Sequence, residues 1–176
     1  MACKRTASNN AANQKIESTL TDSLKPSISE HTQQDTIKPK LNEAVHGVTG
    51  RELVDFGKTL LGVPYRYGSI DPSKGFDCSG FITYVFNHFN IAVPRSSIDF
   101  TNVGKEIDLQ TAKEGDLILF TGTVDSIRLV GHMGIITENT DTLKFIHSTS
   151  GKANGVTISP LSKHYKLRFV KVIRVF

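Results

Sequence analysis

The sequence has few cysteines, no tryptophan and no long apolar run. Only two cysteines, Cys3 and Cys78, occur among 176 residues, which excludes a dense disulfide framework as the source of stability. No stretch approaches the roughly 18 uncharged apolar residues that cross a bilayer as a helix. The net charge is only +4 and the basic residues are scattered, so nothing indicates nucleic acid as a partner. The fold must therefore be stabilised by packing of apolar side chains.

The beginning of the chain lacks both glycine and aromatic residues. All fourteen aromatic residues lie at or after Phe56, and all fourteen glycines lie at or after Gly47. A polar segment with so little to bury cannot offset an ordering entropy of roughly 1–2 kcal/mol per residue. We interpret residues 1–48 as a flexible polar tether and residues 49–176 as the folded domain. A helix over about residues 10–24 that docks on the domain is the alternative.

Cys3 lies at the start of this tether. The residues around it form neither a charged region nor an apolar region of a signal peptide. A cysteine in this position, followed by a long polar tether, resembles a mature bacterial lipoprotein, in which Cys3 would carry the lipid anchor. An incidental cysteine in the tail of a cytosolic protein is the alternative, and the sequence leaves both open.

Two helical patterns follow the tether. Thr49 and Glu52 have the Thr-x-x-Glu form of a capping box, and the apolar residues after them predict a helix over residues 50–61. From Cys78 to Phe89 the apolar residues recur on a single helical face. Cys78 is therefore predicted to lie in the first turn of a helix that faces the core.

Strands dominate the rest of the chain, after a short helix that Ser96 or Ser97 caps and that ends at Gly104. Five short segments are rich in β-branched and aromatic residues and are separated by turn residues. They are residues 117–120, 133–137, 143–147, 156–158 and 167–175. Because helices come first and strands afterwards, we predict an α+β domain with helices packed on a small antiparallel sheet.

Cys78 is the candidate nucleophile. It stands at the end of a loop rich in Gly and Pro and at the start of a helix, where backbone N–H groups and the helix dipole favour an anion. Such a position predicts a thiol pKa below the ordinary value. A buried structural cysteine is the alternative, but the neighbouring Asp77, Ser79 and Gly80 are not the residues expected around a cysteine that packs in an apolar core.

His132 and His147 are the candidate partners of this thiol. His132 begins one predicted strand and His147 ends the next, so an antiparallel hairpin places the two imidazoles at the same end of the sheet. His132 would take the thiol proton, and His147 would fix the tautomer of His132. A metal site formed by both histidines and Cys78 is the competing interpretation, but zinc ligands usually pair at close sequence spacing. His164 is assigned no role.

Several segments, in order and spacing, resemble the NlpC/P60 family of cell-wall cysteine peptidases. They cover roughly residues 52–176 and read PYRYGSIDPSKGFDCSGFITYVF, IAVPRSSIDF, KEGDLILF, GHMGIIT and FIHSTS. The resemblance implies a papain-like α+β fold in which the cysteine lies at the N-terminus of a helix and the histidines lie on the sheet.

The resemblance also implies roles for individual residues. Cys78 matches the family nucleophile, His132 the general base and His147 the third polar residue. Tyr65 matches a tyrosine near the oxyanion and substrate site. Asp77 and Ser79, which flank Cys78, match residues that contact the substrate in relatives. Arg95 is interpreted as a structural ion-pair partner rather than as a wall of the groove.

The function that follows is hydrolysis of peptidoglycan stem peptides, between γ-D-Glu and meso-diaminopimelate or Lys, without metal or cofactor. Two alternatives stay open: a wall-binding or partner-binding module without catalysis, and an acyltransferase or amidase that uses the same Cys–His pair. We expect a monomer in the bacterial cell envelope, in the periplasm or at the outer surface. A lipid on Cys3 would anchor it there.

Overall fold

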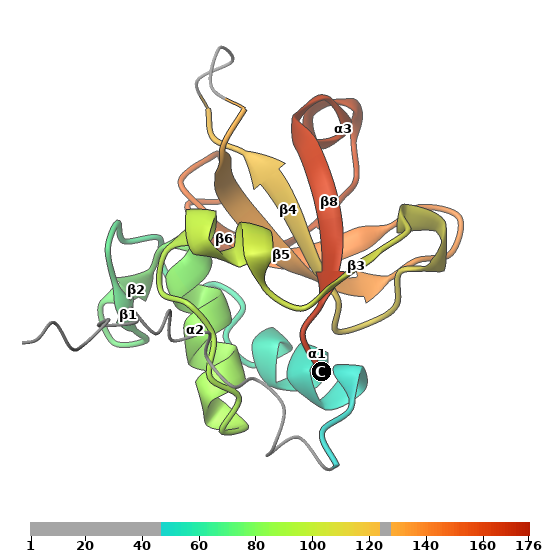
Figure 1. Cartoon of the computed structure of the whole chain (residues 1–176). Coiled ribbons are helices and arrows are strands. Elements are labelled where there is room, and N and C mark those ends of the chain that lie inside the picture. Colours follow the sequence, from blue (N-terminus) through green and yellow to red (C-terminus); the bar gives the residue numbers. More distant parts are fainter. Residues whose placement is uncertain (1–46, 124–127) are drawn as a thin grey trace, which may run out of the picture. The chain divides into compact units, whose positions relative to one another are not determined.

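A computed structural model describes residues 47–123 and 128–176. Cys3, the alternative helix over residues 10–24 and all but the last two residues of the predicted tether lie outside these described residues. In the described part, a six-stranded antiparallel sheet is combined with helices, two of which pack together on one side of it (Figure 1). The predicted α+β architecture is confirmed.

The helix α1 (Gly50–Lys58) begins at the predicted capping box. Thr49 accepts a hydrogen bond from the backbone N–H of Glu52, and the Glu52 carboxylate accepts one from the backbone N–H of Thr49 at 2.7 Å. The helix ends three residues earlier than predicted. Turns follow it, and Gly62 has a positive φ of 83°, a backbone conformation that glycine adopts without strain.

The helix α2 (Cys78–His88) carries the predicted cysteine as its first residue. A short hairpin of β1 (Ile70–Asp71) and β2 (Gly75–Phe76) precedes it, and the sequence pattern did not predict this hairpin. The hairpin brings the chain directly to the first turn of α2, so Cys78 follows a buried strand without a long flexible connection.

The sheet has the order β3-β8-β4-β5-β6-β7, and every neighbouring pair is antiparallel. Its strands are β3 (Lys105–Ile107), β4 (Leu117–Thr121), β5 (Val130–Glu138), β6 (Lys144–Thr149), β7 (Gly155–Pro160) and β8 (Phe169–Arg174). Two 3₁₀ helices, η1 (Ser97–Asn102) and η2 (Leu109–Thr111), lie on either side of β3 in the sequence. Four of the five predicted strands coincide with β4 to β7, and the edge strand β3 was not predicted.

The C-terminal segment differs from the prediction. The last strand was expected over residues 167–175, but residues Lys163–Arg168 form the helix α3 and β8 starts only at Phe169. Six residues are too few to establish a helical repeat in the sequence. The structure therefore adds a helix, which carries His164 and Tyr165, next to the strands that hold the candidate site.

Two apolar clusters lie on opposite faces of the sheet. Leu117 and Leu119 of β4 belong to the cluster that also contains the buried residues of α1 and α2. Ile118 and Phe120, which alternate with them, belong to a second cluster that packs against Tyr165 of α3. The sheet is therefore covered on both faces, and its interior strands are almost entirely buried.

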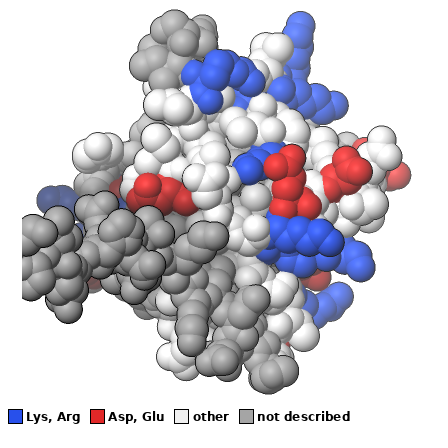
Figure 2. Space-filling model, in the orientation of Figure 1, with Lys and Arg blue, Asp and Glu red and all other residues white. Residues whose placement is uncertain are grey.

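Charged side chains of opposite sign are mixed on the surface. On the face that Figure 2 shows, basic and acidic side chains lie beside one another rather than in separate patches. Two basic residues of β8 pair with acidic side chains: Arg174 lies 2.7 Å from Asp116, and Lys171 lies 3.4 Å from Glu106. Within the two described ranges, no helix has the length and apolar character that a membrane crossing requires.

Candidate active site

Asp77 caps the N-terminus of α2, the helix that begins with Cys78. The Asp77 carboxylate accepts a hydrogen bond of 2.6 Å from the backbone N–H of Gly80, which satisfies one of the free donors of the first turn. Asp77 is only 7% exposed, so its carboxylate has little access to water. The position of the nucleophile therefore depends on a buried charge that needs a partner.

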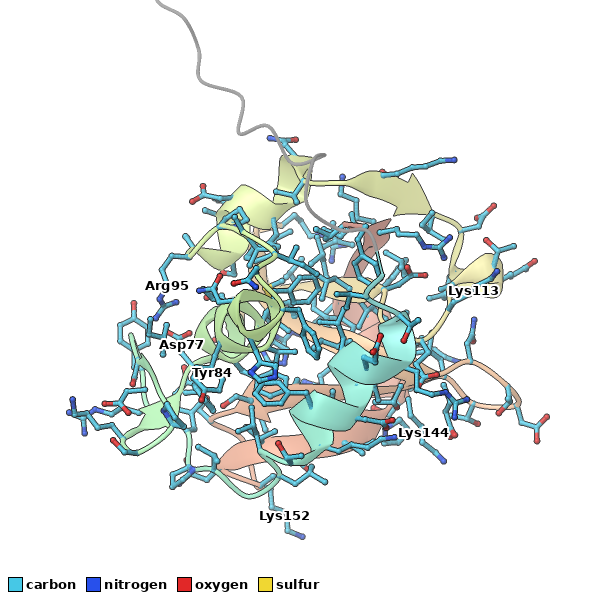
Figure 3. The ribbon with its side chains drawn as sticks, turned by 90° about the horizontal axis from the view of Figure 1, so that it is seen from below. Asp77, Tyr84, Arg95, Lys113, Lys144 and Lys152 are labelled. Atoms are coloured by element: carbon cyan, nitrogen blue, oxygen red, sulfur yellow. The ribbon has the colours of Figure 1, made fainter. Side chains whose placement is uncertain are left out.

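Arg95 supplies that partner. Its guanidinium donates to both oxygens of the Asp77 carboxylate, at 3.1 and 2.7 Å, and to the hydroxyl of Ser79 at 3.1 Å. Figure 3 shows the Arg95 and Asp77 side chains next to each other beside α2. The predicted structural role of Arg95 is confirmed, because a forked pair of this kind fixes the carboxylate in position.

Replacing Arg95 tests this support. We expect Arg95→Ala to lower the free energy of unfolding by about 1–2 kcal/mol, because Asp77 stays buried without its charged partner. Alkylation of Cys78 by iodoacetamide at pH 7.5 should also become slower, since Arg95 helps to lower the pKa of the thiol. Urea unfolding and the alkylation rate measure the two effects.

Arg51→Ala is the matched control. Arg51 lies 3.9 Å from Glu114 and its side chain is 78% exposed, so its loss should change the free energy of unfolding by less than about 0.5 kcal/mol. Equal stability and equal alkylation rates in the two variants would contradict the supporting role of Arg95.

The sulfur of Cys78 contacts the sheet at the start of β5. Its Sγ atom lies 3.8 Å from the carbonyl oxygen of Gly131, the residue before His132. Burial and the negative charge of Asp77 raise the pKa of the Cys78 thiol, although backbone N–H groups at the helix start oppose this rise. The expectation of a lowered pKa is wrong, because desolvation outweighs the helix terminus. At rest the sulfur therefore holds its proton.

His132 and His147 form a hydrogen-bonded pair. Nε2 of His132 lies 2.9 Å from Nδ1 of His147, and the two rings meet nearly edge to face. Gly134, two residues after His132, lets β6 approach β5 closely, because a Cβ there would lie 2.6 Å from the Phe145 ring and 2.8 Å from the carbonyl oxygen of Ile146. A break in the regular pairing of β4 and β5 lies directly beside His132, after its partner Phe120. Irregularities of this kind redirect side chains at strand ends.

Both imidazoles are held in the neutral form. Burial lowers the pKa of His132 well below 6.5, and the electrostatic effects of the neighbouring His147, Arg168 and His164 lower it further. Burial alone lowers the pKa of His147 to about 4. A neutral imidazole has one bare nitrogen, and Nδ1 of His132 forms no hydrogen bond with any described residue. When the proton of the neutral ring lies on Nε2, His132 can accept a second proton on Nδ1.

A single cavity joins the sulfur to the base. It has a volume of about 1130 Å³, and Tyr65, Cys78 and His132 all line it. Tyr65 lies near enough to the sulfur for a thiolate to raise the pKa of its phenol, after the larger effect of burial. The structure forms no hydrogen bond between Cys78 and His132 among the described residues, and such contacts often close only when substrate is bound.

Asp77 and Ser79 are placed differently from the other candidates. Neither lines the cavity, and both are buried and bonded to Arg95. The substrate contact suggested by the resemblance is therefore not supported. Their contacts instead assign them to the support of α2, behind the nucleophile.

The sequence analysis missed much of the cavity wall, including three polar residues of β7 and α3. Ser159 of β7, Tyr165 of α3 and Arg168 at the end of α3 all line it. Arg168 donates to the carbonyl oxygen of Thr121 at 2.7 Å and lies 3.1 Å from Nε2 of His164, while its buried Nε atom has no partner among the residues that the structure describes. The strand β7 continues two residues beyond its predicted end at residue 158, and α3 is too short to be recognised in the sequence, so no signal singled these residues out.

Within the described ranges, no group of three or more His, Cys, Asp or Glu side chains is arranged to hold a metal ion. The chemistry that the arrangement offers is that of a thiol, an imidazole that can take its proton, and a second imidazole that orients the first.

The comparisons with known proteins agree on one protein family and its relatives. The NlpC/P60 family matches residues 62–174, which is more than half of the chain. The gamma-DL-glutamyl hydrolase of Bacillus subtilis is 36% identical over 114 residues, covering 64% of this chain and 26% of that protein. The murein DD-endopeptidase MepS/murein LD-carboxypeptidase of Escherichia coli K12 is 34% identical over 117 residues, covering 65% and 56%.

A solved structure agrees with the sequence relatives. An NlpC/P60 family protein from Bacillus cereus superposes with a TM-score of 0.65 at 28% identity, covering 73% of this chain and 40% of that one. The chain spans about a quarter to about half of the length of the two curated relatives described above.

Proposed function

The chain belongs to the NlpC/P60 family, and we propose that it is a cysteine peptidase that hydrolyses the stem peptides of peptidoglycan. The observation that carries the proposal is the single cavity into which Cys78, His132 and Tyr65 all open. The hydrogen bond between His132 and His147 supports it further, because it leaves the base with one nitrogen free. The catalytic residues in this proposal are Cys78 and His132, with His147 in the orienting position.

The first step transfers the thiol proton to Nδ1 of His132. Sγ then forms a bond to the carbonyl carbon of the scissile amide, and the electron pair of the C=O bond moves to oxygen. Because burial raises the pKa of the thiol and lowers that of His132, the resting pair is uncharged. The charged pair arises only together with the attack on substrate.

Two donors are available for the oxyanion. The backbone N–H of Cys78 lies in the first turn of α2, and the Tyr65 phenol lies in the wall of the same cavity. The Cys78 N–H is fixed by the helix before substrate arrives, so it can stabilise the negative charge without reorganisation. His132 then returns its proton to the leaving amine, and the C–N bond breaks.

Water completes the reaction. His132, neutral again, takes a proton from water as the oxygen attacks the thioester carbon, and the C–S bond breaks with the proton going to sulfur. The products are a carboxylic acid and an amine. The protein's own residues supply every proton transfer in this scheme.

The proposed bond lies between γ-D-Glu and meso-diaminopimelate or Lys. The names of two relatives already differ, since one is called a gamma-DL-glutamyl hydrolase and the other a murein DD-endopeptidase/LD-carboxypeptidase. The site of action would be the bacterial cell envelope, where peptidoglycan lies. Residues 49–176 would act there as one catalytic domain, as a monomer, and a lipid on Cys3 would attach it to a membrane.

Digestion of defined substrates tests the proposal. The full chain is incubated with muropeptides that contain tripeptide stems and, separately, with cross-linked dimers, and the products are identified by mass spectrometry. We expect release of the diaminopimelate or Lys part from the tripeptide stems, with one water added per bond. Binding without turnover, or transfer of the acyl group to an amine or alcohol in place of water, would contradict it.

A further inference from the structure

The hydrogen bonds of the histidine pair continue one residue further. Nε2 of His147 lies 3.0 Å from the hydroxyl oxygen of Ser159, on the neighbouring strand β7. His132, His147 and Ser159 thus form an unbroken row across β5, β6 and β7. His147 is completely buried, so no water competes for its ring nitrogens.

Such a row can run in two directions. In one, Nε2–H of His132 donates to Nδ1 of His147, and Nε2–H of His147 donates to the hydroxyl oxygen of Ser159. In the other, every bond is reversed, and the proton of neutral His132 moves to Nδ1. Only the first direction leaves Nδ1 of His132 bare, and that is the nitrogen needed for the Cys78 proton. The position of one hydroxyl hydrogen at the end of the row therefore decides whether the base is usable.

Tyr165 of α3 packs beside this row. Its ring packs against both imidazoles, with centroids 6.3 Å from His132 and 5.7 Å from His147. The proposed mechanism needs Nδ1 of His132 bare, so in the active protein the row runs in the first direction and Ser159 accepts from Nε2–H of His147.

We propose that Ser159 is a positioning residue: it accepts the hydrogen bond of His147 and so supports the direction of the row that leaves Nδ1 of His132 free for the Cys78 proton. The proposal rests on the proposed function only for the role of His132 as the base. Arg168 and His164 of α3 also act on His132, as charges rather than as links of the row.

Tautomers of the two histidines test the proposal without any substrate. The full chain is labelled with ¹⁵N, and long-range ¹H–¹⁵N spectra are recorded at pH 7.5 for the wild type and for Ser159→Ala. In the wild type both rings should carry their proton on Nε2. In Ser159→Ala, which leaves Nε2–H of His147 without an acceptor, a population protonated on Nδ1 should appear in both rings.

Kinetics provide the second measurement. On a tripeptide stem, Ser159→Ala should lower kcat about 10- to 100-fold, as expected for the loss of a hydrogen bond to the imidazole that orients the charged base. KM should change less than about threefold, because Ser159 acts through His147 and not on the substrate. Ser159→Thr restores a hydroxyl and should recover most of kcat.

Ser162→Ala is the matched control. Ser162 is exposed, lies three residues after Ser159 and forms no side-chain cap. The histidine tautomers and the kcat of Ser162→Ala should therefore equal those of the wild type. A wild type with the proton of His147 on Nδ1, or unchanged tautomers in Ser159→Ala, would overturn the proposal. Correct tautomers in a protein that cleaves no stem peptide would support the positioning role and contradict the proposed function.

Discussion

Replacing Cys78 by alanine is expected to lower the rate of stem-peptide cleavage at least about 10⁴-fold, because no other group can form the acyl intermediate. Cys78 lies partly exposed at the start of α2, and Asp77 caps the helix independently of the sulfur. The fold should therefore survive, and the variant should still bind stem peptides. Single-turnover assays that follow muropeptides by mass spectrometry measure the loss.

The second cysteine provides the control for this experiment. Cys3→Ala removes a sulfur that has no part in the proposed mechanism, and it should cleave stem peptides at the rate of the wild type. Thermal melting checks that Cys78→Ala is folded. Residual cleavage by folded Cys78→Ala above about 1% of the wild-type rate would contradict the assignment of the nucleophile.

Acidification is expected to destabilise the protein through His147. The pKa of this buried imidazole is about 4 in the folded protein, against 6.5 for an unperturbed histidine. Between these values the unfolded chain binds a proton that the folded protein does not, so stability decreases as the pH falls from 6.5 to 4. The loss due to His147 amounts to about 3 kcal/mol over this window, and the lowered pKa of His132 adds a loss of the same sign.

Urea unfolding at pH 7, 6, 5 and 4 measures this loss, and His147→Asn provides the comparison. Asparagine can still accept a hydrogen bond from Nε2–H of His132, but it does not titrate, so the loss should shrink by about 3 kcal/mol. Asp71, whose folded pKa is about 2, loses its contribution only at lower pH and does not enter this window. Equal pH dependence in the wild type and His147→Asn would show that burial of His147 is not the cause.

Local patterns predicted the parts of the fold that local forces determine. The capping box at Thr49 and Glu52 and the apolar face after Cys78 placed the starts of α1 and α2 correctly, because caps and helical periodicity depend on residues a few positions apart. The edge strand β3 and the helix α3 were missed, because three and six residues carry too little pattern.

In the candidate site, too, some features follow from local sequence patterns and others do not. The position of Cys78 and the meeting of the two imidazoles could be inferred from the order of helix and hairpin. The role of Asp77 could not, because its partner Arg95 is 18 residues away. The direction of the pKa shift of Cys78 depends on desolvation, which only the packed structure determines.

The protonated state of the resting sulfur also bears on damage by oxidants. Peroxides convert thiolates, and far more slowly thiols, to sulfenic acid and then to irreversible sulfur oxyacids. Burial and the adjacent Asp77 carboxylate keep Cys78 as the thiol until His132 removes its proton. The burial and the Asp77 charge that keep Cys78 protonated between turnovers therefore also slow its oxidation.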